Sequence, residues 1–231
     1  MRVAGVLGAV WVAICVVITA LSPSASAAST AVTIGRTADD LPIRAWRVGS
    51  PDAKRTVLVV GEIHGSEPAG RAVARRLRAM RPPRGVALLL VESANPDGGR
   101  AGTRWNGHGV DLNRNFPFGW QPIGLPFDTY HSGSAPLSEP ESSAMARLIR
   151  SVQPRVTVWY HQHMRLVDRS GGDPRLERLY ARRSRLPYRS ISPLPGTATR
   201  WQNHAYPRDS AFVVELPAGS TRAPSTVTPR R

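Results

Sequence analysis

The sequence predicts an α/β protein with a single domain, built on a mixed, mostly parallel central sheet with helices on both faces. Two observations support this fold class. Runs such as 56–60 and 86–91 are apolar throughout, as strands buried on both faces are. They alternate with amphipathic stretches of helical period, and strands that alternate with helices form parallel sheets. The chain has 231 residues, 41% of them hydrophobic, which is enough to bury such a core.

The elements of this domain, residues 30–217, follow one another in a regular order. We expect strands at 30–36, 42–48, 56–60, 86–91, 155–160 and 211–216, and helices at 67–80, 138–152 and 173–185. The first two strands alternate apolar and polar residues on either side of a turn. The first helix has an apolar stripe with arginines opposite it. The second opens with Ser138-Glu139-Pro140-Glu141, the pattern of a capping box.

The stretch from 92 to 137 has no periodicity and is rich in Gly, Pro, Asn and Asp. A loop of this length in a compact domain is usually functional or disordered. Its six aromatic residues indicate that it packs onto the domain, so we expect a functional loop.

Both ends of the chain differ in composition from the domain. Arg2 is followed by an uncharged apolar stretch to residue 21, and Ala25-Ser26-Ala27 has the small-x-small pattern of a cleavage site. This predicts a signal peptide at 1–27, with a retained membrane anchor as the alternative. We therefore expect a secreted protein, extracellular or associated with the cell wall, without stable membrane association after cleavage. Residues 218–231 have no apolar core positions and are expected to be a disordered tail.

Cysteine and charge exclude several classes of function. The single cysteine, Cys15, lies in the predicted signal peptide, so the mature protein has no disulfide, no thiol nucleophile and no thiolate metal ligand. The net charge of +15 comes almost entirely from scattered arginines. These fit either attraction to polyanions or a solvated surface, and no nucleic-acid motif accompanies them. We expect a monomer that does not bind nucleic acid.

Polar side chains lie at or just after the ends of three of the predicted strands. His64 and Glu67 come after the strand 56–60, His161 after 155–160, and Glu215 lies in the last strand. Because the carboxyl ends of parallel strands meet at one edge of the sheet, these side chains should converge. Two imidazoles and one carboxylate are the ligands of a catalytic zinc ion with an open fourth position. His163 is the alternative to His161, since strand residues two apart share a face.

Further segments complete a recognisable pattern. They are His64-Gly-Ser-Glu67, Asn95-Pro-Asp-Gly98, Arg104, Gly109-Val-Asp-Leu-Asn-Arg-Asn-Phe-Pro117, His161 and Phe212-Val-Val-Glu215. Together they resemble the zinc carboxypeptidase family of the carboxypeptidase A type, and within it the short bacterial branch that includes the murein peptide amidases. The resemblance covers nearly the whole predicted domain.

The resemblance implies one zinc ion per chain, held by His64, Glu67 and His161. It implies that Glu215 is the general base that activates the zinc-bound water. Asp111 falls where the family has a carboxylate behind the first zinc histidine, and such a partner fixes the tautomer of the ring.

The same resemblance assigns roles to substrate-binding residues. Arg104 would polarise the scissile carbonyl and stabilise the oxyanion, while Asn113 and Arg114 would hold the terminal carboxylate of the substrate. An arginine can grip a carboxylate with two parallel hydrogen bonds, which a lysine cannot.

Two places depart from the family pattern. Gln162-His163-Met164 replaces the small residues and tyrosine that usually follow the zinc histidine. No residue before Glu215 matches the mobile tyrosine that caps the pocket in the digestive enzymes. Tyr206 is one candidate, with His204 and Gln202 as alternatives.

The function that this resemblance implies is that of a secreted zinc metallocarboxypeptidase or amidase. It would hydrolyse a peptide or γ-glutamyl amide bond next to a residue with a free carboxylate, with cell-wall (murein) peptides as the favoured substrates. The first alternative is an N-acyl amino acid deacylase of the succinylglutamate desuccinylase or aspartoacylase kind. The second is a non-catalytic basic wall-binding protein, which would be expected to have lost ligands or the base. The sequence does not select the side chain that the pocket takes.

Overall fold

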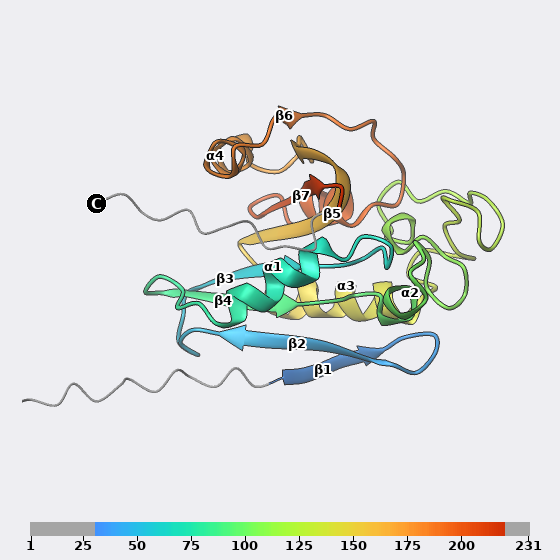
Figure 1. Cartoon of the computed structure of the whole chain (residues 1–231), viewed down its shortest axis with the longest axis horizontal. Coiled ribbons are helices and arrows are strands. Elements are labelled where there is room, and N and C mark those ends of the chain that lie inside the picture. The colour runs from blue at the N-terminus through green and yellow to red at the C-terminus, as the bar shows by residue number, and fades with distance from the viewer. Residues whose placement is uncertain (1–30, 220–231) are drawn as a thin grey trace, which may run out of the picture.

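The computed structural model describes residues 31–219, so the predicted signal peptide and nearly all of the predicted tail lie outside the described residues. A seven-stranded sheet forms the centre of this region (Figure 1). In chain order the elements are β1 (Ala31–Arg36), β2 (Pro42–Val48), β3 (Arg55–Val60), α1 (Ala69–Arg78), β4 (Val86–Val91), α2 (Pro96–Ala101), a 3₁₀ turn (Leu112–Arg114), α3 (Pro140–Val152), β5 (Val156–Asp168), α4 (Pro174–Ser184), β6 (Tyr188–Arg189), α5 (Ala198–Ala205) and β7 (Ser210–Pro217). In this part of the chain, no helix has the length and apolar character needed to cross a bilayer.

The sheet is mixed, as the sequence predicts. Its strand order is β1-β2-β4-β3-β5-β6, and β7 pairs with β5. The pairs β1–β2 and β2–β4 are antiparallel, whereas β3 pairs in parallel with both β4 and β5. The partners β6 and β7 of β5 are parallel as well. The antiparallel part is therefore confined to the β1–β2 edge.

Helices cover both faces of the sheet, which also confirms the predicted fold class (Figure 1). On one face α3 and α5 pack on a core that includes Ile43, Leu58, Met145, Ile149, Trp159, Trp201 and Val213. On the other face α1 and α4 pack on a core that includes Val59, Ala74, Leu90, Val158, Ala181, Phe212 and Val214. Side chains alternate between the two faces along β5 and β7, so neighbouring residues pack into opposite cores.

The long segment 92–137 is more ordered than its composition suggests. It contains α2, which starts at Pro96 because the Asn95 side chain accepts a hydrogen bond from the Gly98 amide at 2.9 Å. Asparagine followed by proline is a helix-start signal, but two glycines among six residues hide it. The predicted aromatic packing is present, because Phe116 is fully buried against Trp159 and Trp201.

Three other expectations need correction. The capping box at the start of α3 does not form, because Ser138 donates its hydroxyl to Glu139 and Glu141 accepts the amide of Ala38 instead. The strand predicted at 155–160 continues to Asp168, since its polar residues still pair with β7. The short elements β6 and α5 were not expected at all. Of these, α5 matters most, because it forms one wall of the cavity described below.

The carboxyl end of β3, the middle of β5 and the last residues of β7 lie side by side. Val60 at the end of β3 pairs with Trp159, and His161, two residues further along β5, pairs with Glu215 on β7. This is the edge where ligand sites of α/β sheets lie. The topology therefore brings His64 and Glu67, which follow β3, to the same place as His161 of β5 and Glu215 of β7.

Candidate active site

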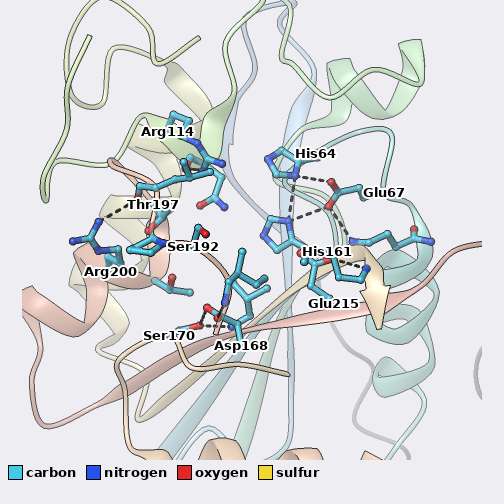
Figure 2. Close-up of a pocket in the computed structure, with 18 of the residues that line it drawn as sticks. His64, Glu67, Arg114, His161, Asp168, Ser170, Ser192, Thr197, Arg200 and Glu215 are labelled. Carbon is cyan, nitrogen blue, oxygen red and sulfur yellow. Dashed lines mark hydrogen bonds and ion pairs between the residues drawn. The ribbon is translucent and has the colours of Figure 1, made fainter. Parts of the chain in front are cut away.

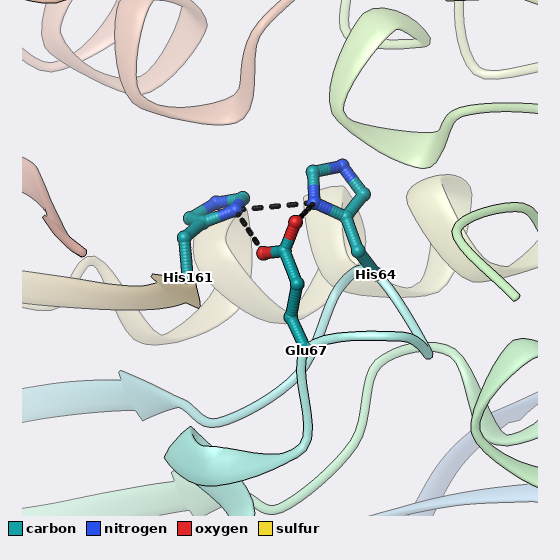
Figure 3. A group of neighbouring side chains, drawn as sticks. All are labelled: His64, Glu67 and His161. Atoms are coloured by element: carbon teal, nitrogen blue, oxygen red, sulfur yellow. Dashed lines mark hydrogen bonds and ion pairs between the residues drawn. The ribbon is translucent and has the colours of Figure 1, made fainter. Parts of the chain in front are cut away.

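Three side chains converge at this edge with atoms that can bind a metal ion (Figure 3). The ligand atoms of His64, Glu67 and His161 all lie within 4.8 Å of one another. The two Nδ1 atoms are 3.2 Å apart, and the Glu67 carboxylate is 3.0 Å from each of them. All three residues are at most 9% exposed. His64 and Glu67 come from the turn between β3 and α1, and His161 from β5.

A buried carboxylate supports this group from behind. Asp111 is fully buried, and its Oδ1 lies 2.9 Å from Nε2 of His64. Burial favours the neutral imidazole, but the carboxylates of Asp111 and Glu67 outweigh it and raise the pKa of His64. Burial also opposes ionisation of Glu67, yet the imidazoles of His64 and His161 hold its pKa well below the usual range. The arrangement keeps the carboxylates charged and turns Nδ1 of His64 toward the cavity.

The donor set fits a zinc ion. Zinc in catalytic sites is held by three protein ligands drawn from nitrogen and oxygen donors, with the fourth position left for water or substrate. Here two imidazole nitrogens and a carboxylate converge, and the Asp111 carboxylate accepts the proton of the other nitrogen of His64. His163 lines the same cavity but does not join the group. The site can therefore hold one metal ion through His64, Glu67 and His161.

Glu215 lies next to this group on the neighbouring strand. It is 7% exposed, pairs in register with His161, and its Oε2 accepts the amide of Met164 at 3.3 Å. Residues that pair in register on adjacent strands point to the same face of a sheet, about 5 Å apart. Figure 2 shows Glu215 below His161 on the same side of the cavity.

Two arginines converge on the same cavity through Asp111. Arg104 donates from Nε and Nη2 to Asp111 Oδ2, at 3.0 and 2.9 Å, and from Nη1 to Glu67 at 3.3 Å. Arg114 is only 4% exposed, and its Nε lies 3.8 Å from the same oxygen of Asp111. The ring of Tyr130 lies 5.7 Å from the Arg104 guanidinium and 5.0 Å from that of Arg114. One buried carboxylate thus orients His64 and both arginines.

Arg114 keeps hydrogen-bonding capacity. Within residues 31–219, its one hydrogen bond runs from Nη1 to the carbonyl of Asn113 at 2.6 Å, and its buried Nε has no hydrogen-bond partner. Asn113 accepts the amide of Ala198 through Oδ1, which leaves its NH₂ group without a protein acceptor among these residues. A buried guanidinium with unused donors is costly unless an anion completes it.

These residues surround one cavity of about 530 Å³ (Figure 2). The metal-ligand group and Glu215 form one side, and Arg114 lies across the cavity from them. The other walls come from the end of β5, the segment before α5 and the first turns of α5. All the sequence-predicted site residues line the cavity apart from Asp111, which lies behind His64.

The pocket-capping candidates do not reach this cavity. Tyr206 packs against Trp201, His204 stacks on Phe118 at 4.0 Å, and Gln202 is buried and donates to Thr157. The tyrosine that does line the cavity is Tyr130, from the long loop. The sequence around Tyr130 indicated only an aromatic-rich loop, and the spacing of its residues did not distinguish Tyr130 from the other aromatic side chains.

Sequence reasoning also missed a second group of cavity residues. Asp168 and Ser170 follow the unexpected extension of β5, and Thr199 and Arg200 belong to the unexpected helix α5. Asp168 lies beyond residue 160, the predicted end of its strand, where the sequence pattern indicated no regular element.

Comparison with known proteins gives a consistent result. The profile of the zinc carboxypeptidase family matches residues 14–80 and 83–177, a stretch that contains His64, Glu67 and His161 and ends before Glu215. Murein peptide amidase A of Escherichia coli (strain K12) is 31% identical over 144 residues, which are 56% of this chain and 57% of that protein. The alignment thus spans little more than half the length of this curated relative.

Solved structures agree. The crystal structure of murein-tripeptide amidase MpaA from Escherichia coli O157 superposes with a TM-score of 0.68 at 26% identity, over 85% of this chain and 88% of that one. Carboxypeptidase A from Helicoverpa armigera gives a TM-score of 0.69 at 20% identity, over 83% of this chain and 60% of that one, which is a likeness of fold. The family match covers well over half of the chain, and the protein belongs to the zinc carboxypeptidase family.

Proposed function

We propose that this protein is a zinc-dependent hydrolase that removes a C-terminal residue with a free carboxylate from a peptide. The observation that carries the proposal is the placement of Arg114, a buried guanidinium with unused donors, across one cavity from His64, Glu67 and His161. A substrate carboxylate bound by Arg114 would hold the preceding amide bond next to the metal site. Cleavage would then be restricted to the end of a chain.

A zinc ion bound by His64, Glu67 and His161 would polarise the substrate carbonyl and would lower the pKa of its bound water to about 7. Glu215 would take the proton of the attacking water and deliver it to the leaving amine, as its position beside His161 allows. Arg104 would stabilise the negative charge that develops on the carbonyl oxygen, because its Nη1 is directed toward the Glu67 side of the cavity. Asp111 holds the Arg104 guanidinium in place before the substrate arrives, so little reorganisation is required.

The substrate carboxylate would be held by Arg114 and by the NH₂ group of Asn113. The Tyr130 ring lies 5.0 Å from the Arg114 guanidinium. Because Arg114 is only 4% exposed, charged hydrogen bonds to its guanidinium are stronger than they would be in water.

We infer that the substrates are peptides derived from the bacterial cell wall. Support comes from the relatives, which carry the names murein peptide amidase and murein-tripeptide amidase. The signal-peptide pattern at 1–27 fits the same compartment, because it would export the protein to where such peptides occur. The scissile bond would be a peptide or γ-glutamyl amide bond.

An activity screen of the purified protein tests the proposal. The substrates are C-terminal dipeptides, γ-glutamyl-diaminopimelate peptides and N-acyl amino acids, each with and without a chelator. We expect chelator-sensitive release of the C-terminal residue from peptides. Cleavage of the N-acyl amino acids alone would instead favour a deacylase, and zinc binding without hydrolysis of any substrate would contradict an enzymatic function.

A further inference from the structure

A second cavity lies on the face of the sheet that α1 and α4 cover. Its volume is about 700 Å³, and residues of α1, α4, β5 and β7 line it. We propose that this cavity, the α1–α4 groove, binds a small amphiphile that has a long apolar chain and an anionic head group. The groove is separate from the catalytic cavity, and the proposal does not depend on the reaction that the protein catalyses.

The strand residues of the groove alternate with residues of the active site. Tyr160 precedes His161 on β5, and Val214 and Leu216 flank Glu215 on β7. Successive side chains of a strand point to opposite faces of a sheet. His161 and Glu215 therefore line the catalytic cavity, while their sequence neighbours line the groove, and the sheet separates the two cavities.

Apolar side chains in the groove remain partly in contact with solvent. Val73 and Leu77 of α1, Leu186 after α4 and Leu216 of β7 are only partly buried, and they pack on the core beneath the groove. Met80, just after α1, is 53% exposed. Transfer of such surface out of water is favourable, so it can supply binding free energy to an apolar chain. The volume also lies in the range of small-molecule sites, about 300–1,000 Å³.

Three arginines line the groove without a partner for their charge. Within residues 31–219, the side chains of Arg76, Arg165 and Arg185 form no ion pair and no hydrogen bond, and no acidic residue lines the groove. By contrast Arg75, which precedes Arg76 on α1, binds Glu92 at 2.8 Å. A guanidinium can bind a carboxylate or a phosphate with two parallel hydrogen bonds. The charge of the groove therefore complements an anionic head group.

A pair of tyrosines in the groove supplies one further hydrogen-bond donor. The hydroxyl oxygens of Tyr160 and Tyr180 are 2.6 Å apart, and both residues line the groove. Each hydroxyl has one proton, and only one of the two protons can lie between the oxygens. The other proton has no acceptor in the part of the chain that the structure describes. An anionic oxygen of a ligand can accept it.

Charge argues against two other occupants of the groove. Residues 220–231, which follow β7 in the sequence, include three arginines and no acidic residue. A second copy of the chain has a net charge of +15. Either would bring positive charge to three unpaired arginines, and such a juxtaposition of like charges is unfavourable. An acidic peptide would match the charge but not the apolar surface, whereas an anionic amphiphile matches both.

Titration calorimetry of the zinc-loaded protein with four probes tests the proposal. Dodecanoate has both the chain and the anionic head, butanoate has the head with a short chain, dodecyltrimethylammonium has the chain with a cationic head, and hexaglutamate has the charge without the chain. Each is used below the concentration at which it forms micelles. We expect one dodecanoate per protein chain, bound at least about a hundredfold more tightly than butanoate and about tenfold more tightly than the other two probes.

Variants at an exposed position of the groove locate the bound probe. Met80→Glu places a carboxylate in the groove and should weaken dodecanoate binding by about tenfold or more, because like charges repel. Met80→Gln removes the same side chain without adding a charge and should keep the affinity within about threefold of the wild type. Leu179→Glu adds the same charge at a position of α4 that is 43% exposed and does not line the groove. It should leave binding unchanged.

Arginine variants identify the contacts of the head group. Arg76→Gln and Arg165→Gln should each weaken dodecanoate binding by about threefold or more, and neither should weaken the binding of dodecyltrimethylammonium. The matched control is Arg183→Gln, which removes an exposed arginine of α4 outside the groove. This control should bind all four probes as the wild type does.

Arg114→Ala examines the catalytic cavity, where a carboxylate could also bind, and this variant should retain dodecanoate binding. Loss of binding in Arg114→Ala, with full binding in Met80→Glu, would place the ligand in the catalytic cavity and overturn the inference. The inference also fails if dodecanoate does not bind, if hexaglutamate binds equally well, or if the cationic probe binds equally well. None of these measurements involves hydrolysis, so their failure would leave the proposed function intact.

Discussion

His161 on β5 and Glu215 on β7 are partners in the register of two adjacent parallel strands. Because paired residues point to the same face of a sheet, the pairing places a metal ligand and a carboxylate side by side. Neither residue depends on a flexible loop for its position. The relationship gives Glu215 a chemical role distinct from metal binding, and substitutions can separate the two.

We expect Glu215→Gln to abolish most turnover while leaving zinc and substrate affinity intact. Glutamine keeps the shape and the acceptor for the Met164 amide but cannot take a proton from water. A general base contributes roughly 10²–10⁴-fold to rate, and kcat should fall within that range. Single-turnover kinetics and metal analysis of the same preparation check this. A Glu215→Gln protein that keeps more than about a tenth of the wild-type kcat would show that Glu215 is not the general base.

The identity of the third metal ligand is tested by a pair of histidine variants. His161→Ala should lose the bound zinc, because His161 contributes one of the three converging ligand atoms. His163→Ala should retain a full equivalent, since that side chain is exposed and lies outside the group. Metal content by plasma emission spectrometry decides between them. Loss of zinc in His163→Ala, with full zinc occupancy in His161→Ala, would identify His163 as the third ligand.

Much of the site was predictable because its residues lie at or just after the ends of the predicted strands. A parallel sheet brings strand ends to one edge, so His64, His161 and Glu215 could be expected to meet without any knowledge of side-chain contacts. Their family pattern then added Arg104 and Arg114, which lie in a segment without periodicity.

The walls of the cavity were not predictable in the same way. Helix α5 has only eight residues, and few of them are strongly apolar, so its periodicity is weak. Its placement depends on tertiary contacts, such as the packing of Trp201 on Phe116. Arg200 and Asp168 therefore became visible as neighbours of one cavity only in the folded chain.

The turn that holds His64 and Glu67 should not tolerate a side chain at Gly65. A Cβ atom there would collide with the backbone of Gly98 and Gly99 in α2, and backbone cannot move aside as a side chain can. We expect Gly65→Ala to lose about 1–3 kcal/mol of unfolding free energy, the usual cost of overpacking, and to weaken zinc binding. Urea denaturation of the metal-free protein and a zinc titration measure the two effects. The matched control is Ser66→Ala in the same turn, where the side chain is exposed. A Gly65→Ala protein with wild-type values in both assays would show that the turn adapts.

Arg114 should determine whether the enzyme requires a free terminal carboxylate. Its guanidinium is buried, has unused donors and faces the cavity across from the metal ligands. For a peptide with a free C-terminal carboxylate, Arg114→Ala should lower kcat/KM by roughly 10²-fold or more, because the carboxylate would be buried without its partner. The same peptide with an amidated C-terminus should be a poor substrate for the wild type and should be nearly indifferent to the change. Arg114→Lys keeps the charge but loses the two-point contact, so it should recover only part of the preference for the acid. Equal losses on acid and amide in both variants would mean that Arg114 supports Asp111 and the metal site, and that another group holds the carboxylate.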